Sequence, residues 1–158
     1  MILYHGGNQE IREPRLNFSR RSLDFGAGFY TTPDFEQASA WASRVARVRG
    51  SGTPIVNIYE TNELWSSLKT LRFEKADRQW LDFVTANRTG RPAENVYDAI
   101  VGPIANDRTI ETLNLYFSGT ITQEIALELL LPQKLKDQYV LKTPRAIEAV
   151  CFNGVKNV

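Results

Sequence analysis

Tyr4-His5-Gly6-Gly7 and Asp24-Phe25-Gly26-Ala27-Gly28-Phe29-Tyr30-Thr31-Thr32 are the two stretches of sequence that decide the fold. The first places the only histidine of the chain at the end of a short apolar run, before two glycines. Such a position is where a strand ends and where backbone can approach a ligand closely. In the second, glycines precede an aromatic residue that begins a strand. Histidine, close-approach glycine and stacking tyrosine suit a planar heterocycle joined to a ribose, which points towards NAD.

The composition is that of one compact domain. At 158 residues and 42% hydrophobic content, the chain is long enough to bury a core, and we expect a single domain over 1–158. The chain has 19 basic and 18 acidic residues, so its net charge is near zero. This balance does not indicate nucleic acid or an acidic membrane as a partner. No segment approaches membrane-spanning length, and no basic region precedes a long apolar stretch. We expect a cytoplasmic protein without a membrane partner.

Cysteine and histidine are too few for a disulfide framework or a zinc site. Cys151 is the only cysteine, and its neighbours Ala149, Val150 and Phe152 predict a buried structural thiol. The chain has no CxxC motif and a single imidazole, so no metal site is expected.

Strand and helix patterns are intermixed along the chain without strict alternation, which favours an α+β fold over a doubly wound sheet. Gly26-Ala27-Gly28 lacks a third glycine and precedes a strand, so it is not a dinucleotide-binding fingerprint. Strands are predicted at 2–5, 28–32, 55–59, 68–73, 97–101, 138–141 and 150–152, and helices at 34–49, 76–87, 109–117, 122–130 and 144–148.

Four motifs in chain order carry a resemblance to a known superfamily. They are LYHGG (3–7), DFGAGFYTT (24–32), YDAIVGPIAND (97–107) and LPQKLKDQYVLKT (131–143). Together they resemble the ADP-ribosyltransferase superfamily in its diphtheria-toxin-like and poly-ADP-ribose-polymerase-like branch, and more closely a bacterial family of small uncharacterised proteins grouped with it. The resemblance implies a split β-sandwich of two small sheets with flanking helices, and NAD as the substrate.

The resemblance also implies roles for four residues of the first two motifs and the helix after them. His5 matches a histidine that hydrogen-bonds a hydroxyl of the nicotinamide ribose. Gly6 matches a residue whose backbone amide and carbonyl hold the nicotinamide carboxamide. Tyr30 matches a tyrosine that stacks on the nicotinamide ring, and Trp41 matches an aromatic residue on the other face of that ring.

The helix that carries Trp41 leaves two questions open. Ala38, Trp41, Ala42 and Val45 share a helical stripe, so Trp41 is either part of the core or part of the site. Ala38 also stands where polymerase-like members have a serine, with Ser39 adjacent, so one hydrogen bond to the carboxamide is either missing or supplied by another residue.

The fourth motif departs from the superfamily at the position of its catalytic glutamate, which is Gln138 here. A glutamine still accepts a hydrogen bond but carries no charge. Losing one preorganised stabilising group typically costs about 2.7–4 kcal/mol of transition-state stabilisation. Asp137 cannot substitute, because neighbouring strand residues point to opposite faces. Either the enzyme is slow, a carboxylate from elsewhere enters the site, or the protein binds NAD without transferring it.

Three carboxylates are candidates for restoring the missing charge. Asp98 and Asp107 lie in the third motif, and Glu36 lies at the start of the first helix. Each has a structural alternative: Asn106 or Asp107 could cap the helix that follows, and Glu36 suits the first turn of a helix.

The predicted function is that of an NAD-dependent mono-ADP-ribosyltransferase. Its predicted catalytic residues are His5, Tyr30 and Gln138. His5, Gly6, Tyr30 and Trp41 are the predicted NAD-binding residues. The acceptor would be a macromolecule, either protein or nucleic acid. By analogy with superfamily toxins, the protein would be a toxin of a toxin–antitoxin or phage-defence system, with an antitoxin protein as a partner. The alternatives are a non-catalytic NAD- or ADP-ribose-binding module, an NAD glycohydrolase, and a domain whose motifs serve only packing.

Overall fold

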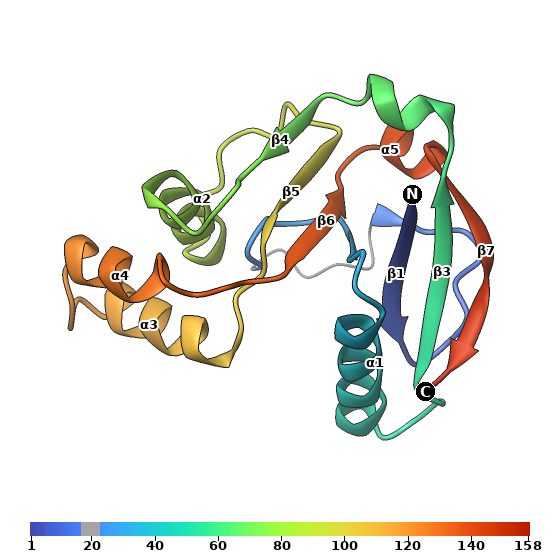
Figure 1. Ribbon diagram of the computed structural model, residues 1–158, viewed down its shortest axis with the longest axis horizontal. Helices are drawn as coiled ribbons and strands as arrows, with labels where there is room; N and C mark the ends of the chain where they lie inside the picture. Colours follow the sequence, from blue (N-terminus) through green and yellow to red (C-terminus); the bar gives the residue numbers. More distant parts are fainter. Residues whose placement is uncertain (17–22) are drawn as a thin grey trace.

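Two small β-sheets and the helices around them make up the computed structural model, which describes residues 1–16 and 23–158 (Figure 1). The three-stranded sheet has the order β1-β3-β7 and is antiparallel throughout. The four-stranded sheet has the order β2-β6-β5-β4, in which only β4 and β5 are parallel. The strands are β1 (Ile2–Gly7), β2 (Phe29–Thr31), β3 (Ile55–Thr61), β4 (Thr70–Arg72), β5 (Ala99–Pro103), β6 (Asp137–Leu141) and β7 (Val150–Asn157). The predicted α+β class with two small sheets is confirmed.

Helices flank both sheets. α1 lies beside β1, while α2, α3 and α4 lie towards the four-stranded sheet (Figure 1). The helices are α1 (Phe35–Arg49), α2 (Arg78–Arg88), α3 (Asp107–Phe117), α4 (Gln123–Leu130), α5 (Pro144–Glu148) and the 3-10 helix η2 (Glu63–Ser67). The predicted limits of α1 are correct because its caps are strong. Asp34 accepts a hydrogen bond from the Gln37 amide at 2.8 Å, and Gly50 ends the helix with a left-handed φ of 63°.

In the part of the chain that the structure describes, the two sheets meet at a single bridge. The backbone of Tyr4 exchanges two hydrogen bonds with that of Thr32, at 2.8 and 2.9 Å. Beyond this bridge β1 and β2 separate. The chain thus forms a split pair of sheets, joined through one residue of each.

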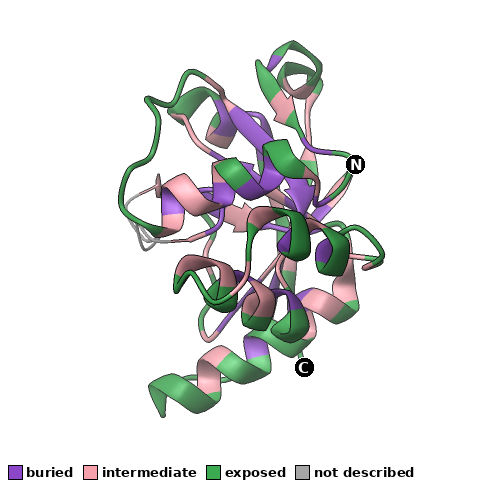
Figure 2. Ribbon diagram, turned by 90° about the vertical axis from the view of Figure 1, so that its left-hand side faces the viewer, coloured by how far each residue is buried: buried purple, intermediate pink, exposed green. Residues whose placement is uncertain are grey.

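Three apolar clusters hold the layers together, and Figure 2 shows the buried residues on the strands and on the inner sides of the helices. One cluster lies between the two sheets and includes Leu3, Phe29 and Leu141. A second packs the four-stranded sheet against α2, α3 and α4, around the fully buried Trp80. A third, small cluster joins the three-stranded sheet to α1 through Ala38, Ala42 and Val56.

The structure differs from the sequence-based prediction at several elements. The last strand extends to Asn157, well beyond the predicted 150–152, because it pairs with the whole length of β3. Cys151 is exposed, so the prediction of a buried thiol is wrong. Strand residues alternate between faces, and its neighbour Val150 takes the buried position. Trp41 is 51% exposed and does not belong to the core stripe of α1.

We predict that a methyl group at Gly6 destabilises the fold much more than one at Gly7. A Cβ at Gly6 would lie 2.1 Å from the Ala38 carbonyl oxygen and 2.8 Å from the Ala42 amide nitrogen, so α1 would have to move. Overpacking of this kind typically costs about 1–3 kcal/mol. Urea denaturation of Gly6→Ala and of Gly7→Ala, whose Cβ meets only ordinary contacts at 3.7 Å or more, measures the difference. Equal losses would contradict the close packing of α1 on β1.

Candidate functional site

Gly6 is buried, and its backbone polar groups face the side of β1 on which β2 separates from it. In an antiparallel sheet, alternate residues turn their N–H and C=O groups towards opposite neighbours. Tyr4 turns both groups away from β3, towards Thr32. Gly6 follows two residues later and therefore turns its groups towards the same edge. Within the described residues neither group of Gly6 has a hydrogen-bond partner, so one donor and one acceptor stand side by side there. We call this place the split edge.

Tyr30 and Gln138 lie on one face of the four-stranded sheet. Tyr30 pairs with Val140, and residues directly opposite each other in adjacent strands share a face. Gln138 is two residues from Val140 on the same strand and shares that face as well. If the Tyr4–Thr32 pairing were continued, Gly6 would lie opposite Tyr30. The structure thus brings three of the predicted site residues to one side of the sheets, around the split edge.

His5 lies on the opposite face of β1 and occupies the gap between the separating strands. Its ring stacks on Phe29 at 4.5 Å between centroids, and its Nδ1 lies 2.7 Å from the Tyr30 carbonyl oxygen. Because a carbonyl only accepts hydrogen bonds, Nδ1 carries the proton. Burial lowers the pKa of His5, and nearby Arg49 adds to this effect. The imidazole is therefore neutral near pH 7, and its Nε2 is an acceptor without a partner in the described structure.

The side chain of Tyr30 is fixed at its hydroxyl end. The hydroxyl donates to the Gly26 carbonyl at 2.6 Å and accepts from the Phe25 amide at 3.1 Å. Burial raises the pKa of Tyr30 far above its usual value, so the hydroxyl stays protonated. Its ring packs against the cluster around Trp80 and is only partly buried. The segment 25–26 thus holds the aromatic ring in one orientation.

Gln138 is 3% exposed, at the start of β6. Its Nε2 lies 3.5 Å from the Pro103 carbonyl oxygen, which also accepts from the Trp80 indole at 3.0 Å. A carboxylate could not donate to that carbonyl, so the contact favours glutamine over glutamate here. Asp137 points the other way, and its carboxylate lies 4.0 Å from Arg72. The expected alternation along this strand is therefore observed.

Trp41 lies on the exposed side of α1, beside Arg44. The Arg44 guanidinium lies 5.7 Å from the centre of the indole ring, and the same group lies 4.0 Å from the Asp107 carboxylate. A cation over an indole face is favourable and orients both side chains. The contact with Asp107 links α1 to the first residue of α3. The structure does not place Trp41 in contact with Tyr30 or Gln138.

None of the three candidate carboxylates contacts Gln138 in the described structure. Asp98 accepts from the Lys69 amide at 2.9 Å and the Thr143 hydroxyl at 2.7 Å, and these bonds lower its pKa. Asp107 is exposed at the start of α3, and Glu36 is exposed in the first turn of α1. Asn106 caps α3, which is one of the two capping alternatives given for this segment from the sequence.

Sequence reasoning missed a group of polar residues that anchors the segment before Tyr30. Asp24 is 5% exposed and forms an ion pair with Arg88 at 2.6 Å. Lys142 donates to the Phe25 carbonyl at 2.5 Å, and burial lowers its pKa to about 8. Asn87 donates to the Asp24 carbonyl at 3.2 Å. These partners lie more than sixty residues from Asp24 or Phe25, so no local pattern could have revealed them.

Gln37 is a further polar residue that the sequence did not single out. It lies in the first turn of α1, and its Oε1 is buried without a hydrogen-bond partner. The sequence could not have shown this, because the burial of one atom of a helical glutamine depends on the packing around it.

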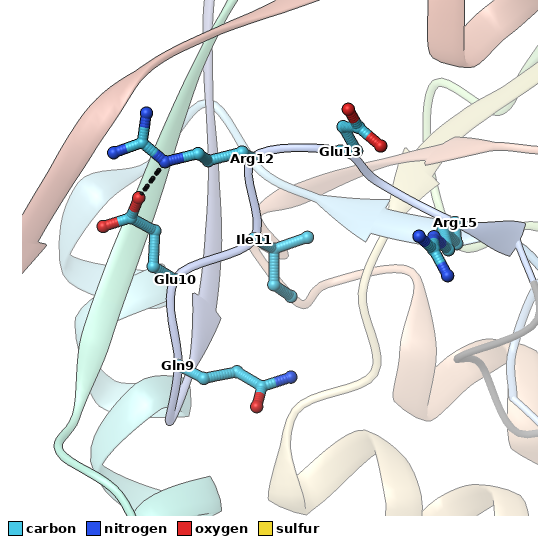
Figure 3. Close-up of a pocket in the computed structure, with 6 residues that line it drawn as sticks. All are labelled: Gln9, Glu10, Ile11, Arg12, Glu13 and Arg15. Atoms are coloured by element: carbon cyan, nitrogen blue, oxygen red, sulfur yellow. Dashed lines mark hydrogen bonds and ion pairs between the residues drawn. The ribbon is translucent and has the colours of Figure 1, made fainter.

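Two surface hollows lie away from these residues. One follows the segment after β1 and is lined by Gln9, Glu10, Ile11, Arg12, Glu13 and Arg15 (Figure 3). In it, Arg12 and Glu10 form an ion pair at 2.5 Å, so their charges cancel. A second hollow lies between Pro14 and α5. None of the predicted site residues lines either hollow.

Across residues 1–16 and 23–158, no group of His, Cys, Asp and Glu side chains is arranged to hold a metal ion. The same residues contain no helix with the length and apolar character needed to cross a membrane.

Comparison with known proteins gives one match. The model of a family of proteins of unknown function, DUF3990, matches residues 1–152. The chain belongs to the DUF3990 family. No curated protein and no solved structure matches the chain.

We predict that His5 titrates below pH 6.5 and is the Nδ1–H tautomer when neutral. Because His5 is the only histidine, its imidazole signals in NMR spectra need no assignment. Burial lowers its pKa, so the unfolded chain binds more protons just below pH 6.5, and stability contributed by neutral His5 falls as the pH drops through that range. A midpoint at or above 6.5 would contradict the burial of the imidazole, and an Nε2–H tautomer would contradict the contact with the Tyr30 carbonyl.

A second pH effect is predicted for Lys142. Its pKa is about 8 in the folded protein and about 10.4 in an unfolded chain. Between these values the unfolded chain binds more protons, so the free energy of unfolding rises with pH. We expect the wild type to gain stability relative to Lys142→Met between pH 8 and 10, as measured by urea denaturation. A difference that does not depend on pH would contradict the burial of this amine.

Proposed function

We propose that the protein is an NAD-dependent mono-ADP-ribosyltransferase. The observation that carries the proposal is the unpartnered backbone of Gly6 at the split edge. A primary carboxamide such as that of nicotinamide offers one carbonyl oxygen and two N–H groups. The Gly6 amide donates to that oxygen and the Gly6 carbonyl accepts from one N–H. The missing side chain of Gly6 lets α1 pack closely at this point.

The neutral imidazole of His5 supports the same proposal. With Nδ1–H bonded to Tyr30, Nε2 is available to accept a hydrogen bond from a ribose hydroxyl near pH 7. An imidazolium could only donate, so the lowered pKa keeps the acceptor available.

An aromatic ring is available for the nicotinamide. Tyr30 shares the face of Gly6 and presents a ring that is fixed by its hydroxyl bonds. Stacking on a fixed ring costs little conformational entropy, which favours Tyr30 as the ring-binding residue. Trp41 is exposed on α1 and in this proposal covers the other side of the ring, as the resemblance implies.

The reaction breaks the bond between ribose C1′ and the nicotinamide nitrogen, and the electron pair leaves with nicotinamide. A nucleophile of the acceptor macromolecule attacks C1′ and loses its proton. Gln138 accepts a hydrogen bond from the ribose through its amide oxygen but supplies no charge. We therefore expect a rate about a hundred- to a thousandfold below that of an enzyme with glutamate at this position. Action on a protein or nucleic acid as a cytoplasmic toxin restrained by an antitoxin belongs to this proposal and rests on the resemblance alone.

A second candidate function is an NAD- or ADP-ribose-binding module without transferase activity. The observation that favours it is the uncharged side chain of Gln138, which is not in contact with Asp98, Asp107 or Glu36 in the described structure. Such a site would bind the nucleotide through the same backbone and imidazole groups.

We predict that the purified protein transfers label from NAD to a macromolecule in a cell lysate. Label that survives nuclease but not protease identifies a protein acceptor, and the reverse identifies nucleic acid. Release of nicotinamide without labelled macromolecule would indicate an NAD glycohydrolase. Intact NAD with a measurable affinity would favour the binding module, and no affinity for NAD would refute both candidate functions.

Variants separate the roles of the site residues. His5→Ala and Tyr30→Ala are expected to abolish NAD-dependent activity, whereas Tyr30→Phe retains the stacking ring and should retain binding. Gln138→Ala removes a neutral hydrogen bond, worth about 0.5–1.5 kcal/mol, and should lower the rate about two- to tenfold. A fully active Gln138→Ala would show that this residue does not contact the ribose.

A further inference from the structure

Lys142 is a half-buried cation that follows the end of β6. Its Nζ lies 2.5 Å from the Phe25 carbonyl oxygen, and among the described residues it has no carboxylate partner. Of the charged groups on the adjoining segments, Asp24 pairs with Arg88 at 2.6 Å, and Asp98 accepts hydrogen bonds from other residues. A cation taken out of water without a carboxylate partner costs free energy, so its position calls for a role beyond packing.

Two glycines of the second motif leave room for this lysine. A Cβ at Gly28 would lie 3.1 Å from the Lys142 Cδ, and one at Gly26 would lie 3.4 Å from the Lys142 Nζ. Gly26 also has a left-handed φ of 71°, which residues with a side chain rarely adopt. The glycines of Gly26-Ala27-Gly28 thus allow a lysine side chain to reach the turn that precedes Tyr30.

The peptide group that Lys142 holds lies between the two groups that hold the Tyr30 hydroxyl. This peptide joins Phe25 to Gly26, and its N–H donates to the Leu23 carbonyl at 2.9 Å. The Tyr30 hydroxyl bonds to the next polar group on each side, the Phe25 amide at 3.1 Å and the Gly26 carbonyl at 2.6 Å. A change in ψ of Phe25 or in φ of Gly26 would therefore move the two partners of the hydroxyl relative to each other.

Other contacts anchor this turn without fixing the direction of the Phe25 carbonyl. Asn87 donates to the preceding carbonyl, that of Asp24, at 3.2 Å. The Phe25 ring is fully buried in the cluster around Trp80, which fixes the side chain rather than the carbonyl. Within the described residues, Lys142 is the only group that donates to the Phe25 carbonyl.

We infer that Lys142 is a positioning residue for Tyr30, whose charged amine fixes the 23–26 turn and so holds the ring in the orientation that binds nicotinamide. This inference rests on the proposed function. A hydrogen bond from a charged donor is roughly twice as strong as one between neutral groups. Loss of the charge on Lys142 therefore loosens the turn, and the affinity for NAD falls.

The charge on Lys142 affects stability and affinity with opposite signs. Burial lowers the pKa of Lys142 to about 8, so above pH 8 the folded protein loses the cost of burying this charge and gains stability. The same loss of charge weakens the hydrogen bond to Phe25. Burial lowers the pKa of His5 below 6.5 and raises that of Tyr30 far above its usual value, so neither group changes charge between pH 7 and 9. A lysine that served the fold alone would not lower the affinity while the stability rises.

Isothermal titration of NAD at pH 7 and at pH 9 tests this inference. We expect the affinity of the wild type to be about fivefold lower at pH 9, because a charged donor becomes a neutral one. Lys142→Met should bind NAD with the lower affinity at both pH values. Tyr30→Phe lacks the hydroxyl that connects the ring to the turn, so its affinity should not depend on pH. Adding Lys142→Met to Tyr30→Phe should cause no further loss.

A matched control and the wild-type profile make the result specific. Lys75→Met applies the same change to an exposed lysine between β4 and α2, and should reproduce the profile of the wild type. Equal wild-type affinities at pH 7 and 9, or the wild-type fall in Lys142→Met or in Tyr30→Phe, would overturn the inference while the proposed function stands. A wild type that binds NAD at neither pH refutes the proposed function and the inference together.

Discussion

The two hydrogen bonds between Tyr4 and Thr32 are the constraint on which the rest of the structure depends. They join the two sheets at one point and fix the register of β1 against β2. Because pairing stops there, the Tyr30 carbonyl does not bond to β1 through the backbone. It accepts a hydrogen bond from the imidazole Nδ1 of His5 instead. The same separation leaves the backbone of Gly6 unpaired. The end of pairing after this short bridge thus accounts for two features, the Nε2 acceptor of His5 and the N–H and C=O groups of Gly6 that have no partner in the described structure.

Local signals explain what could be predicted from the sequence. Asp34 and Gly50 are a strong cap pair, so the limits of α1 were predictable. Asn106 was one of two candidate caps for α3, which begins two residues before the predicted start at 109. The four motifs also located the strands that meet around the gap. The face that each residue occupies follows from alternation along a strand, which correctly separated Gln138 from Asp137.

Burial and long-range partners could not be predicted, because they depend on how distant segments pack. Trp41 fits the apolar stripe of α1, but the sheet is covered by Ala38 and Ala42, whose small size brings the helix too close for an indole. Cys151 lies in an apolar stretch of sequence, but its side chain is on the exposed face of β7. The ion pair of Asp24 with Arg88 closes a loop of more than sixty residues.

The charges near β6 explain why Gln138 decides between the two candidate functions. Asp24 is neutralised by Arg88, and Asp137 faces Arg72 on the other side of the strand. Gln138 is thus a neutral amide among apolar side chains, held near the carbonyl that Trp80 also uses. Such a site binds an uncharged part of a nucleotide without repulsion, and gives weak stabilisation to a developing cation. In the proposed function, the arrangement of Gly6, His5 and Tyr30 serves binding and transfer equally, and Gln138 is the residue that distinguishes the two.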